Sequence, residues 1–101
     1  MPDFQCLPAH AESAVKILKA MANKRRLLIL CTLTQGEKCV GDLEQMVGIS
    51  QSALSQHLAK LRSDGLVATR RDAQTIYYTV SSPAVTEMLC SLKRIFAETK
   101  N

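Results

Sequence analysis

The sequence predicts a mainly α fold with one β-hairpin. Its 101 residues are close to the commonest size of a single domain, and 47% of them are hydrophobic, which is enough for a folded core. Apolar residues recur at helical spacing through most of the chain, whereas residues 66–80 contain two β-branched runs with polar residues between them. The predicted order is four helices, two strands and a final helix.

The first two helices are predicted to follow a short arm. Residues 1–9 contain two prolines and no periodicity, so we expect a flexible N-terminal arm there and one folded domain at residues 10–101. The spacing of apolar residues predicts the first helix at about residues 10–21. Asn23 is a candidate N-cap for a second helix at residues 24–33, whose apolar residues on nearly every side predict a central position.

Residues 40–65 have the pattern of two helices joined by a tight turn. Apolar residues at positions i, i+3 and i+7 predict a short first helix: Val40, Leu43 and Val47. Gly48 lies where the chain must turn sharply, Ser50 can cap the second helix, and Gly65 can end it. A helix, a short turn with glycine and a second helix together form the helix-turn-helix pattern, in which the second helix reads DNA.

The second helix of this pair has two different faces. Leu54, Leu58 and Leu61 form an apolar stripe that predicts its buried side. The other side carries short hydroxyls, an amide and a small methyl, which allow a helix to enter the DNA major groove and contact base edges, while cations contact phosphates. The predicted DNA contacts of this segment are Ser50, Gln51, Ser52, Ser55, Gln56, Lys60 and Arg62.

A β-hairpin is predicted after this helix. Its strands are expected at residues 66–70 and 75–80, and residues 71–74 are expected to form the turn. The predicted DNA contacts at or near its tip are Arg70, Arg71 and Gln74, which give it the charge of a wing that contacts the phosphate backbone or the minor groove. Of the neighbours Tyr77 and Tyr78, one must face the core. The predicted fold is therefore a winged helix-turn-helix.

The last helix predicts self-association. Ser82 can cap it and Pro83 is a favoured first residue. Its apolar stripe is broad and consists of Val85, Met88, Leu89, Leu92, Ile95 and Phe96. Because the first and last helices expose more apolar surface than so short a chain can cover, we expect a symmetric homodimer through the terminal helices. Its two recognition helices would lie about 34 Å apart and match a palindromic operator in double-stranded DNA.

Charge and composition restrict the class of protein. The net charge is +4, and basic residues group at residues 24–26, at residues 60 and 62 and at residues 70 and 71, around the candidate recognition helix. No apolar run reaches the ~20 residues that span a membrane, and no secretory signal is visible, so we expect a cytoplasmic protein without membrane association. His10 and His57 are the only histidines, and no nucleophile and base pair or phosphate loop is indicated. We do not expect an enzyme.

Four segments of the chain carry a resemblance to a known family: LKAMANKRRLLILCTL, CVGDL, SQSALSQHLAKLRSDGLV and RRDAQTIYYTV. With these segments in this order and spacing, the chain from about Ala14 to Phe96 resembles the ArsR/SmtB family of winged-helix transcriptional repressors. Within the family, the chain is most similar to the branch of the hemolysin activator HlyU and the biofilm repressor BigR, which includes sensors of reactive sulfur species. The resemblance implies a dimeric repressor that leaves its operator when an inducer acts.

The resemblance implies a thiol sensor as one kind of inducer site. Cys31 matches a cysteine of the persulfide-sensing branch, whose partner cysteine corresponds to Ala97 in this chain. Cys90 lies two helical turns before that position, about 10 Å along the helix axis. If Cys31 faces position 97, Cys90 is therefore too far from it for a disulfide unless the helices rearrange. Modification of Cys31 alone or a polysulfide link to Cys90 remains open, and either residue can instead be a small core residue.

The resemblance also implies a metal sensor as the alternative. Cys39 and Asp42 match two ligands of a family metal site, and the spacing of Cys6 and His10 matches ligands that the arm donates from the other protomer. Two thiolates, an imidazole and a carboxylate form a ligand set that suits Zn(II) as a possible inducer, and we expect no required cofactor. Sensing of neither agent is a third possibility. The alternative from another class is a protein-interaction module that does not bind DNA.

Overall fold

The computed structural model describes residues 8–99. It consists of η1 (Pro8–His10), α1 (Ala11–Met21), α2 (Lys24–Leu33), β1 (Lys38–Cys39), α3 (Val40–Val47), α4 (Gln51–Ser63), β2 (Val67–Asp72), β3 (Thr75–Val80) and α5 (Pro83–Thr99). This order confirms the predicted succession of four helices, a hairpin and a final helix. Pro8 and Ala9 belong to a 3-10 turn rather than to the predicted arm, since proline fits the start of a helical turn. The remainder of that arm lies outside the described residues.

The core forms where α2, α3, α4, α5 and the base of the hairpin meet. Its fully buried side chains are Ile29, Leu30, Leu43, Leu54, Leu58, Leu61, Val85 and Leu89. α2 contributes two of these and α4 contributes three, which confirms the central position predicted for α2 and the leucine stripe predicted for α4. Packing of this stripe fixes which side of α4 is left for solvent.

Local interactions set the ends of the helices as predicted. The Asn23 side chain accepts hydrogen bonds from the backbone N–H groups of Arg25 and Arg26, at 3.0 and 3.1 Å. The Ser50 hydroxyl accepts one from the Ala53 N–H at 3.3 Å. Gly48 ends α3 with a φ of 77°, a left-handed conformation that glycine adopts without steric cost. The turn of the helix-turn-helix is thus built from the residues that predicted it.

The sheet has three strands rather than the two that were predicted. β1 adds to the hairpin, giving the antiparallel order β1-β3-β2. β2 extends to Asp72, which pairs with Thr75, so the turn is shorter than predicted. Ala73 has a φ of 57°, and a two-residue hairpin loop needs such positive φ values. The polar residues at 71 and 72 are therefore strand residues near the tip of the wing.

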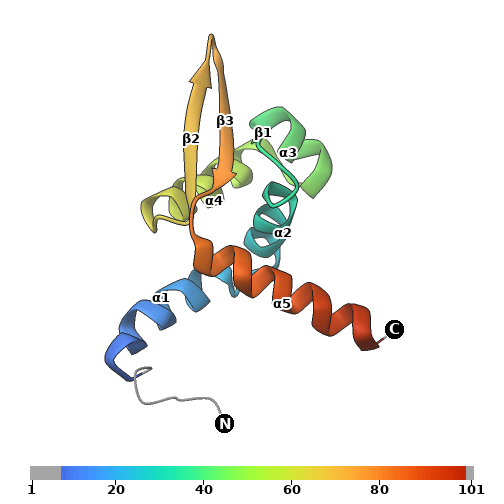
Figure 1. Ribbon diagram of the computed structural model, residues 1–101. Coiled ribbons are helices and arrows are strands. Elements are labelled where there is room, and N and C mark those ends of the chain that lie inside the picture. Colours follow the sequence, from blue (N-terminus) through green and yellow to red (C-terminus); the bar gives the residue numbers. More distant parts are fainter. Residues whose placement is uncertain (1–7, 100–101) are drawn as a thin grey trace.

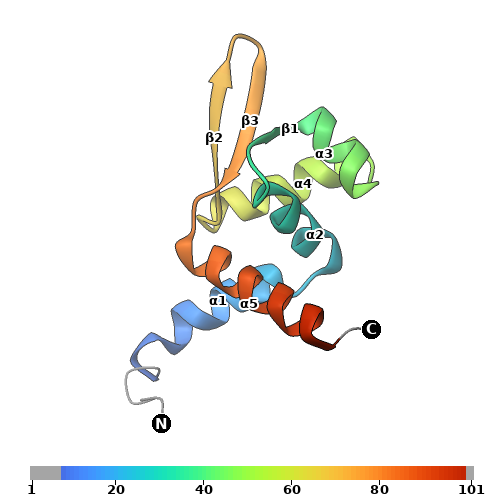
Figure 2. The same ribbon diagram turned by 45° about the vertical axis from the view of Figure 1, so that its right-hand side comes forward.

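The wing and the two terminal helices lie at opposite ends of the molecule. In both views α1 and α5 lie at the end away from the wing, and α4 lies beneath the base of the hairpin (Figures 1 and 2). α2 lies between these two ends and packs against elements of both. Within the part of the chain that the structure describes, no helix is both long and apolar enough to cross a membrane.

Candidate nucleic-acid interface

The solvent side of α4 presents the small polar side chains that were predicted to contact bases. Ser52, Ser55 and Gln56 are exposed, together with Ala59. The Ser50 and Ser52 hydroxyls lie 3.4 Å apart at the start of the helix. Because the leucine stripe anchors the opposite side, this face of α4 is held outward and is free to enter a groove.

The cations of α4 lie toward its end. Lys60 Nζ lies 3.4 Å from Asp64 Oδ2, in an i,i+4 pair whose lysine side chain is exposed and whose aspartate side chain is largely covered. Arg62 is exposed and helps to line a shallow polar hollow between α4 and β3. The other residues that line this hollow are Ser55, Ala59, Ser63 and Tyr78.

Tyr78 is a part of this surface that sequence reasoning missed. It packs against the core, as expected for one of the two neighbouring tyrosines, yet it also lines the hollow beside Arg62. A tyrosine has an apolar ring and a polar hydroxyl, so one side chain can serve both environments. The packing of β3 beside α4 was needed to find it.

The two arginines of the wing lie on opposite faces of the sheet. Thr69 pairs with Tyr78, and Arg71 lies two residues farther along the same strand, so Arg71 shares the face of Tyr78 and of the polar hollow. Arg70 pairs with Tyr77 on the other face. Only one of these two predicted phosphate contacts therefore lies on the side of the sheet that faces α4.

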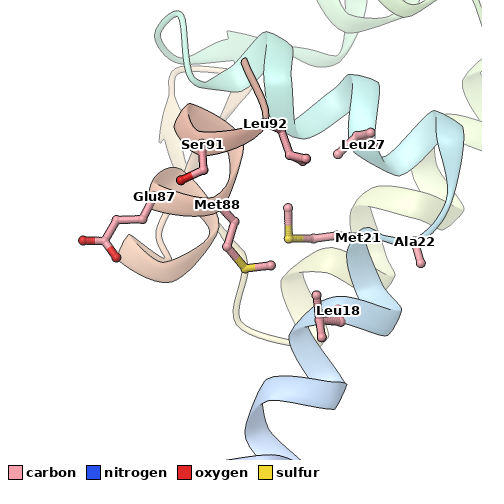
Figure 3. Close-up of a pocket in the computed structure, with 8 residues that line it drawn as sticks. All are labelled: Leu18, Met21, Ala22, Leu27, Glu87, Met88, Ser91 and Leu92. Atoms are coloured by element: carbon pink, nitrogen blue, oxygen red, sulfur yellow. The ribbon is translucent and has the colours of Figure 1, made fainter. Parts of the chain in front are cut away.

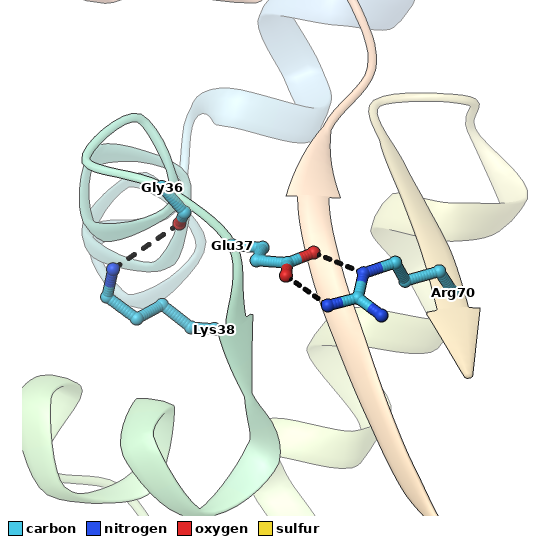
Figure 4. A network of polar contacts seen from close by, with 4 residues as sticks. All are labelled: Gly36, Glu37, Lys38 and Arg70. Carbon is cyan, nitrogen blue, oxygen red and sulfur yellow. Dashed lines mark hydrogen bonds and ion pairs between the residues drawn. The ribbon is translucent and has the colours of Figure 1, made fainter. Parts of the chain in front are cut away.

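Arg70 is engaged within the protein. Its Nε donates to Glu37 Oε2 at 2.8 Å, and its Nη2 donates to Glu37 Oε1, so the contact is bidentate (Figure 4). The guanidinium carbon lies 4.6 Å from the centre of the Tyr77 ring. Hydrogen bonding to Arg70 lowers the pKa of Glu37, and the same contact raises the pKa of Arg70. The predicted phosphate contact of Arg70 would require this pair to open.

The three basic residues at the start of α2 also differ in their surroundings. Arg26 is half-buried, and its Nε donates to the carbonyl oxygen of Ala20 at 2.7 Å, which joins α1 to α2. Lys24 and Arg25 remain exposed at the helix N-terminus. Burial, followed by the charges of Arg26 and Arg25, lowers the pKa of His57 on α4. This shift favours the uncharged imidazole, so His57 adds less to the basic surface than an ordinary histidine would.

Comparisons with known proteins agree with this geometry. The model of the family described as bacterial regulatory protein, arsR family, matches residues 23–69. Transcriptional activator HlyU of Vibrio cholerae serotype O1 is 51% identical over 96 residues, which cover 95% of this chain and 89% of HlyU. The chain belongs to the ArsR family of bacterial regulatory proteins.

Solved structures of ArsR-family regulators share the whole fold. The transcriptional repressor BigR from Xylella fastidiosa superposes with a TM-score of 0.89 at 36% identity, covering 94% of this chain and 97% of BigR. The homodimeric winged helix-turn-helix DNA-binding domain of Mb0332 from Mycobacterium bovis has a TM-score of 0.79 at 30% identity, covering 94% of this chain and 88% of that one. The chain is therefore a transcriptional regulator with a winged helix-turn-helix DNA-binding fold. Its relatives are named as regulators and not as enzymes, in agreement with the prediction.

The cysteines that the ArsR resemblance singled out lie in different surroundings. Cys31 is half-buried on α2 and packs against the core, whereas Cys90 is exposed on α5, and both are free thiols. α5 reaches the end of α2, because Lys93 Nζ donates to the Thr34 hydroxyl at 3.3 Å and that hydroxyl donates to the Cys31 carbonyl at 2.6 Å. Cys31 thus lies next to the junction of a core helix and a terminal helix.

Within residues 8–99, the predicted zinc ligands His10, Cys39 and Asp42 do not form one cluster. Cys39 is half-buried at the N-terminus of α3, Asp42 is exposed in the first turn of that helix, and His10 is exposed beside α1. Cys6 lies outside the described residues. Among residues 8–99 no three His, Cys, Asp or Glu side chains gather as a metal site. Because the predicted set combines ligands from two protomers, the zinc site stays a prediction.

Proposed function

We propose that this ArsR-family regulator is a dimeric repressor that recognises a specific palindromic operator. The observation that carries the proposal is the position of the exposed Ser52, Ser55 and Gln56 on one side of α4, with Arg62 and Arg71 on the neighbouring surfaces. Short polar side chains can read base edges in the major groove, and the flanking cations can neutralise phosphates. The predicted contacts of Ser50, Gln51, Lys60 and Gln74 complete this footprint, whereas the predicted contact of Arg70 would compete with its bidentate contact to Glu37.

The apolar surface at the other end supports the dimer. Leu18 of α1 is 50% exposed and Ile95 of α5 is 51% exposed. An apolar hollow lies between the terminal helices and α2, and side chains from all three point into it (Figure 3). Its apolar lining consists of Leu18, Met21, Ala22, Leu27, Met88 and Leu92. A second copy that covers this end would remove that surface from water.

The dimer would set the spacing of the operator. An isologous contact through α1 and α5 places two copies of α4 on the side away from the contact, related by a two-fold axis. Recognition helices in such dimers read half-sites about one helical turn, roughly 34 Å, apart. We infer that the operator is a palindrome with half-sites at that spacing.

We infer that modification of the Cys31 thiol releases the repressor from DNA. The thiolate attacks a sulfur of a polysulfide, an S–S bond breaks, a shortened polysulfide leaves, and Cys31 retains one added sulfur as a persulfide. Cys31 is half-buried and packs against the core, where added volume shifts neighbouring groups, so we expect the added sulfur to displace α2. Such a displacement would change the angle between two dimer-related copies of α4.

Fluorescence anisotropy on a duplex from the protein's own upstream region tests this proposal. Reduced, metal-free protein is titrated before and after polysulfide treatment, alongside Cys31→Ala and the control Cys90→Ser. We expect tight binding by all three reduced proteins, and loss of binding after treatment in the wild type and Cys90→Ser but not in Cys31→Ala. Retained binding by treated wild type, with added sulfur on Cys31 verified by mass spectrometry, would contradict the thiol mechanism.

The same titration separates the alternatives. Loss of binding only after one equivalent of Zn(II) would favour the metal sensor and assign the ligands Cys6, His10, Cys39 and Asp42. The zinc alternative is supported by Cys39 and Asp42 lying together at the start of α3. Absence of salt-dependent DNA binding in every state would favour a protein-interaction module instead.

A further inference from the structure

An ion pair joins the wing to the body of the molecule. Glu37 directly precedes β1, and Arg70 on β2 reaches it across β3, which lies between them in the sheet. The two residues are 33 positions apart in sequence. Figure 4 shows Arg70 reaching over β3 to Glu37. The guanidinium of Arg70 also lies over the ring of Tyr77 on β3, so this one side chain contacts β3 and the residue before β1 as well as belonging to β2.

Arg70 lies at the point where the wing loses its third strand, because it pairs with Tyr77, the last β3 residue that also pairs with β1. β1 pairs with β3 only through Tyr77 and Tyr78, and Tyr77 is the outer of these two residues. Beyond it, Ile76 and Thr75 pair with β2 alone, up to the turn. A two-stranded ribbon without further support is marginally stable and strongly twisted. The direction of the tip therefore depends on the contacts at its base, where Arg70 is anchored.

We propose that Glu37 and Arg70 are positioning residues that aim the wing at DNA, an inference that rests on the proposed DNA-binding function. Arg71 lies on the opposite face of the same strand and is the wing cation that would contact phosphate. The Glu37 to Arg70 pair holds the strand, and the strand presents Arg71. Arg70 itself stays with Glu37 in the complex instead of moving to the DNA backbone.

The Glu37→Gln variant distinguishes positioning from simple electrostatics by the direction of its effect. Removal of a negative charge near DNA should tighten binding to any duplex if charge alone matters. Loss of the bidentate contact should instead leave the wing misdirected and weaken binding, by about 3- to 10-fold. Asp72→Asn is the matched control, because it removes an anion from the wing without removing the Glu37 to Arg70 contact. We expect Asp72→Asn to bind as tightly as the wild type or more tightly.

Arg71→Ala provides the second readout. In the wild type we expect this change to reduce the slope of log affinity against log salt by about 0.9, the value for one lost phosphate contact. In the Glu37→Gln background the same change should have little further effect, since a misdirected wing no longer brings Arg71 to the phosphate. A merely structural role of Glu37 would leave the contribution of Arg71 unchanged.

Different results would contradict the positioning role of Glu37 and the proposed DNA-binding function. Tighter binding by Glu37→Gln, or a full additional loss from Arg71→Ala in that background, would overturn the inference. Amide hydrogen exchange of residues 75–78 tests it without DNA: we expect faster exchange in Glu37→Gln than in Asp72→Asn, at a melting temperature close to that of the wild type. Unchanged exchange overturns the inference even if the protein binds DNA, whereas wild-type protein that does not bind DNA overturns the proposed function.

Discussion

At the scale of single residues, adjacent arginines in this fold differ in whether they contact the protein itself or remain available to DNA. Arg70 and Arg71 have the same chemistry, but strand alternation directs one toward Glu37 and the other to the face shared with Tyr78. Arg26 joins α1 to α2 through backbone carbonyls, while its neighbour Arg25 remains exposed. A count of basic residues thus overstates the cations available to DNA.

The contribution of Gln56 to sequence recognition can be measured directly. Gln56 is exposed on the outer face of α4 and its amide can form two hydrogen bonds with an adenine edge. We expect Gln56→Ala to cost about 1–3 kcal/mol on the operator and to bind scrambled DNA as the wild type does. Competition binding with the two duplexes measures both values, and an equal loss on both would contradict a base contact.

His57 predicts how stability depends on pH. Burial and the nearby charges of Arg26 and Arg25 lower its pKa below the ordinary value of 6.5, so the unfolded chain takes up a proton more readily. The free energy of unfolding should therefore be unaffected by His57 above pH 6.5 and decrease as the pH falls below that value. Urea unfolding at pH 7.5 and 5.5, at fixed protein concentration, should show a smaller decrease for His57→Gln. The same decrease in both proteins would contradict the assignment.

Residue patterns predicted local features better than contacts between distant residues. The leucines of α4 and the caps Asn23 and Ser50 depend on near neighbours in the sequence, and each is confirmed. The contact of Glu37 with Arg70 depends on how three strands align, which no local pattern contains. Tyr78 likewise could be assigned to the core but not to the surface beside Arg62.

At the scale of elements, the N-terminus of α4 determines where its outer face begins. The Ser50 hydroxyl satisfies the Ala53 N–H, one of the backbone donors that the first turn of a helix leaves unpaired. We expect Ser50→Ala to lower the free energy of unfolding by about 0.5–2 kcal/mol and Ser50→Asp to retain most of it. Chemical denaturation of both variants measures this. Equal losses in Ala and Asp variants would show that the cap is unimportant.

The terminal helices should control the oligomeric state. Ile95 is 51% exposed on α5, at the end of the molecule that we assign to the dimer contact. We expect Ile95→Glu to produce a folded monomer with much weaker operator binding, because a buried unpaired charge opposes association. Met46 on α3 is 53% exposed at the other end and provides the control Met46→Glu, which should remain dimeric. Sedimentation equilibrium distinguishes the two, and a dimeric Ile95→Glu would contradict the assigned contact.

Element boundaries were predicted well for helices and less well for the sheet. α5 begins at Pro83 as expected, with the Ser82 hydroxyl accepting from the Val85 N–H at 3.3 Å. β1 was not predicted, because two residues are too few to show an alternating pattern. The extension of β2 to Asp72 was not predicted, because a run of charged and polar residues is more typical of a turn than of a strand. Both features lie in the wing, where long-range pairing determines the structure.

At the scale of the whole molecule, one core connects two surfaces. The leucines of α4 pack into the same cluster as Ile29 and Leu30 of α2 and Leu89 of α5. A change beside α2 or α5 can therefore reach the end that carries α4 through packed side chains, since protein cores are close-packed and transmit displacement. The family relationship establishes a transcriptional regulator, and this shared core supports a mechanism in which an inducer at one end alters DNA binding at the other.

The central claim is that the outer face of α4 and the wing recognise a specific DNA sequence. The most direct test compares the affinity of the reduced protein for its own upstream duplex and for a scrambled duplex of equal composition, over a series of salt concentrations. We predict at least about 10³-fold tighter binding to the upstream duplex, with log affinity decreasing linearly with log salt on both. Equal affinity for the two duplexes, or affinity that does not depend on salt, would contradict the claim.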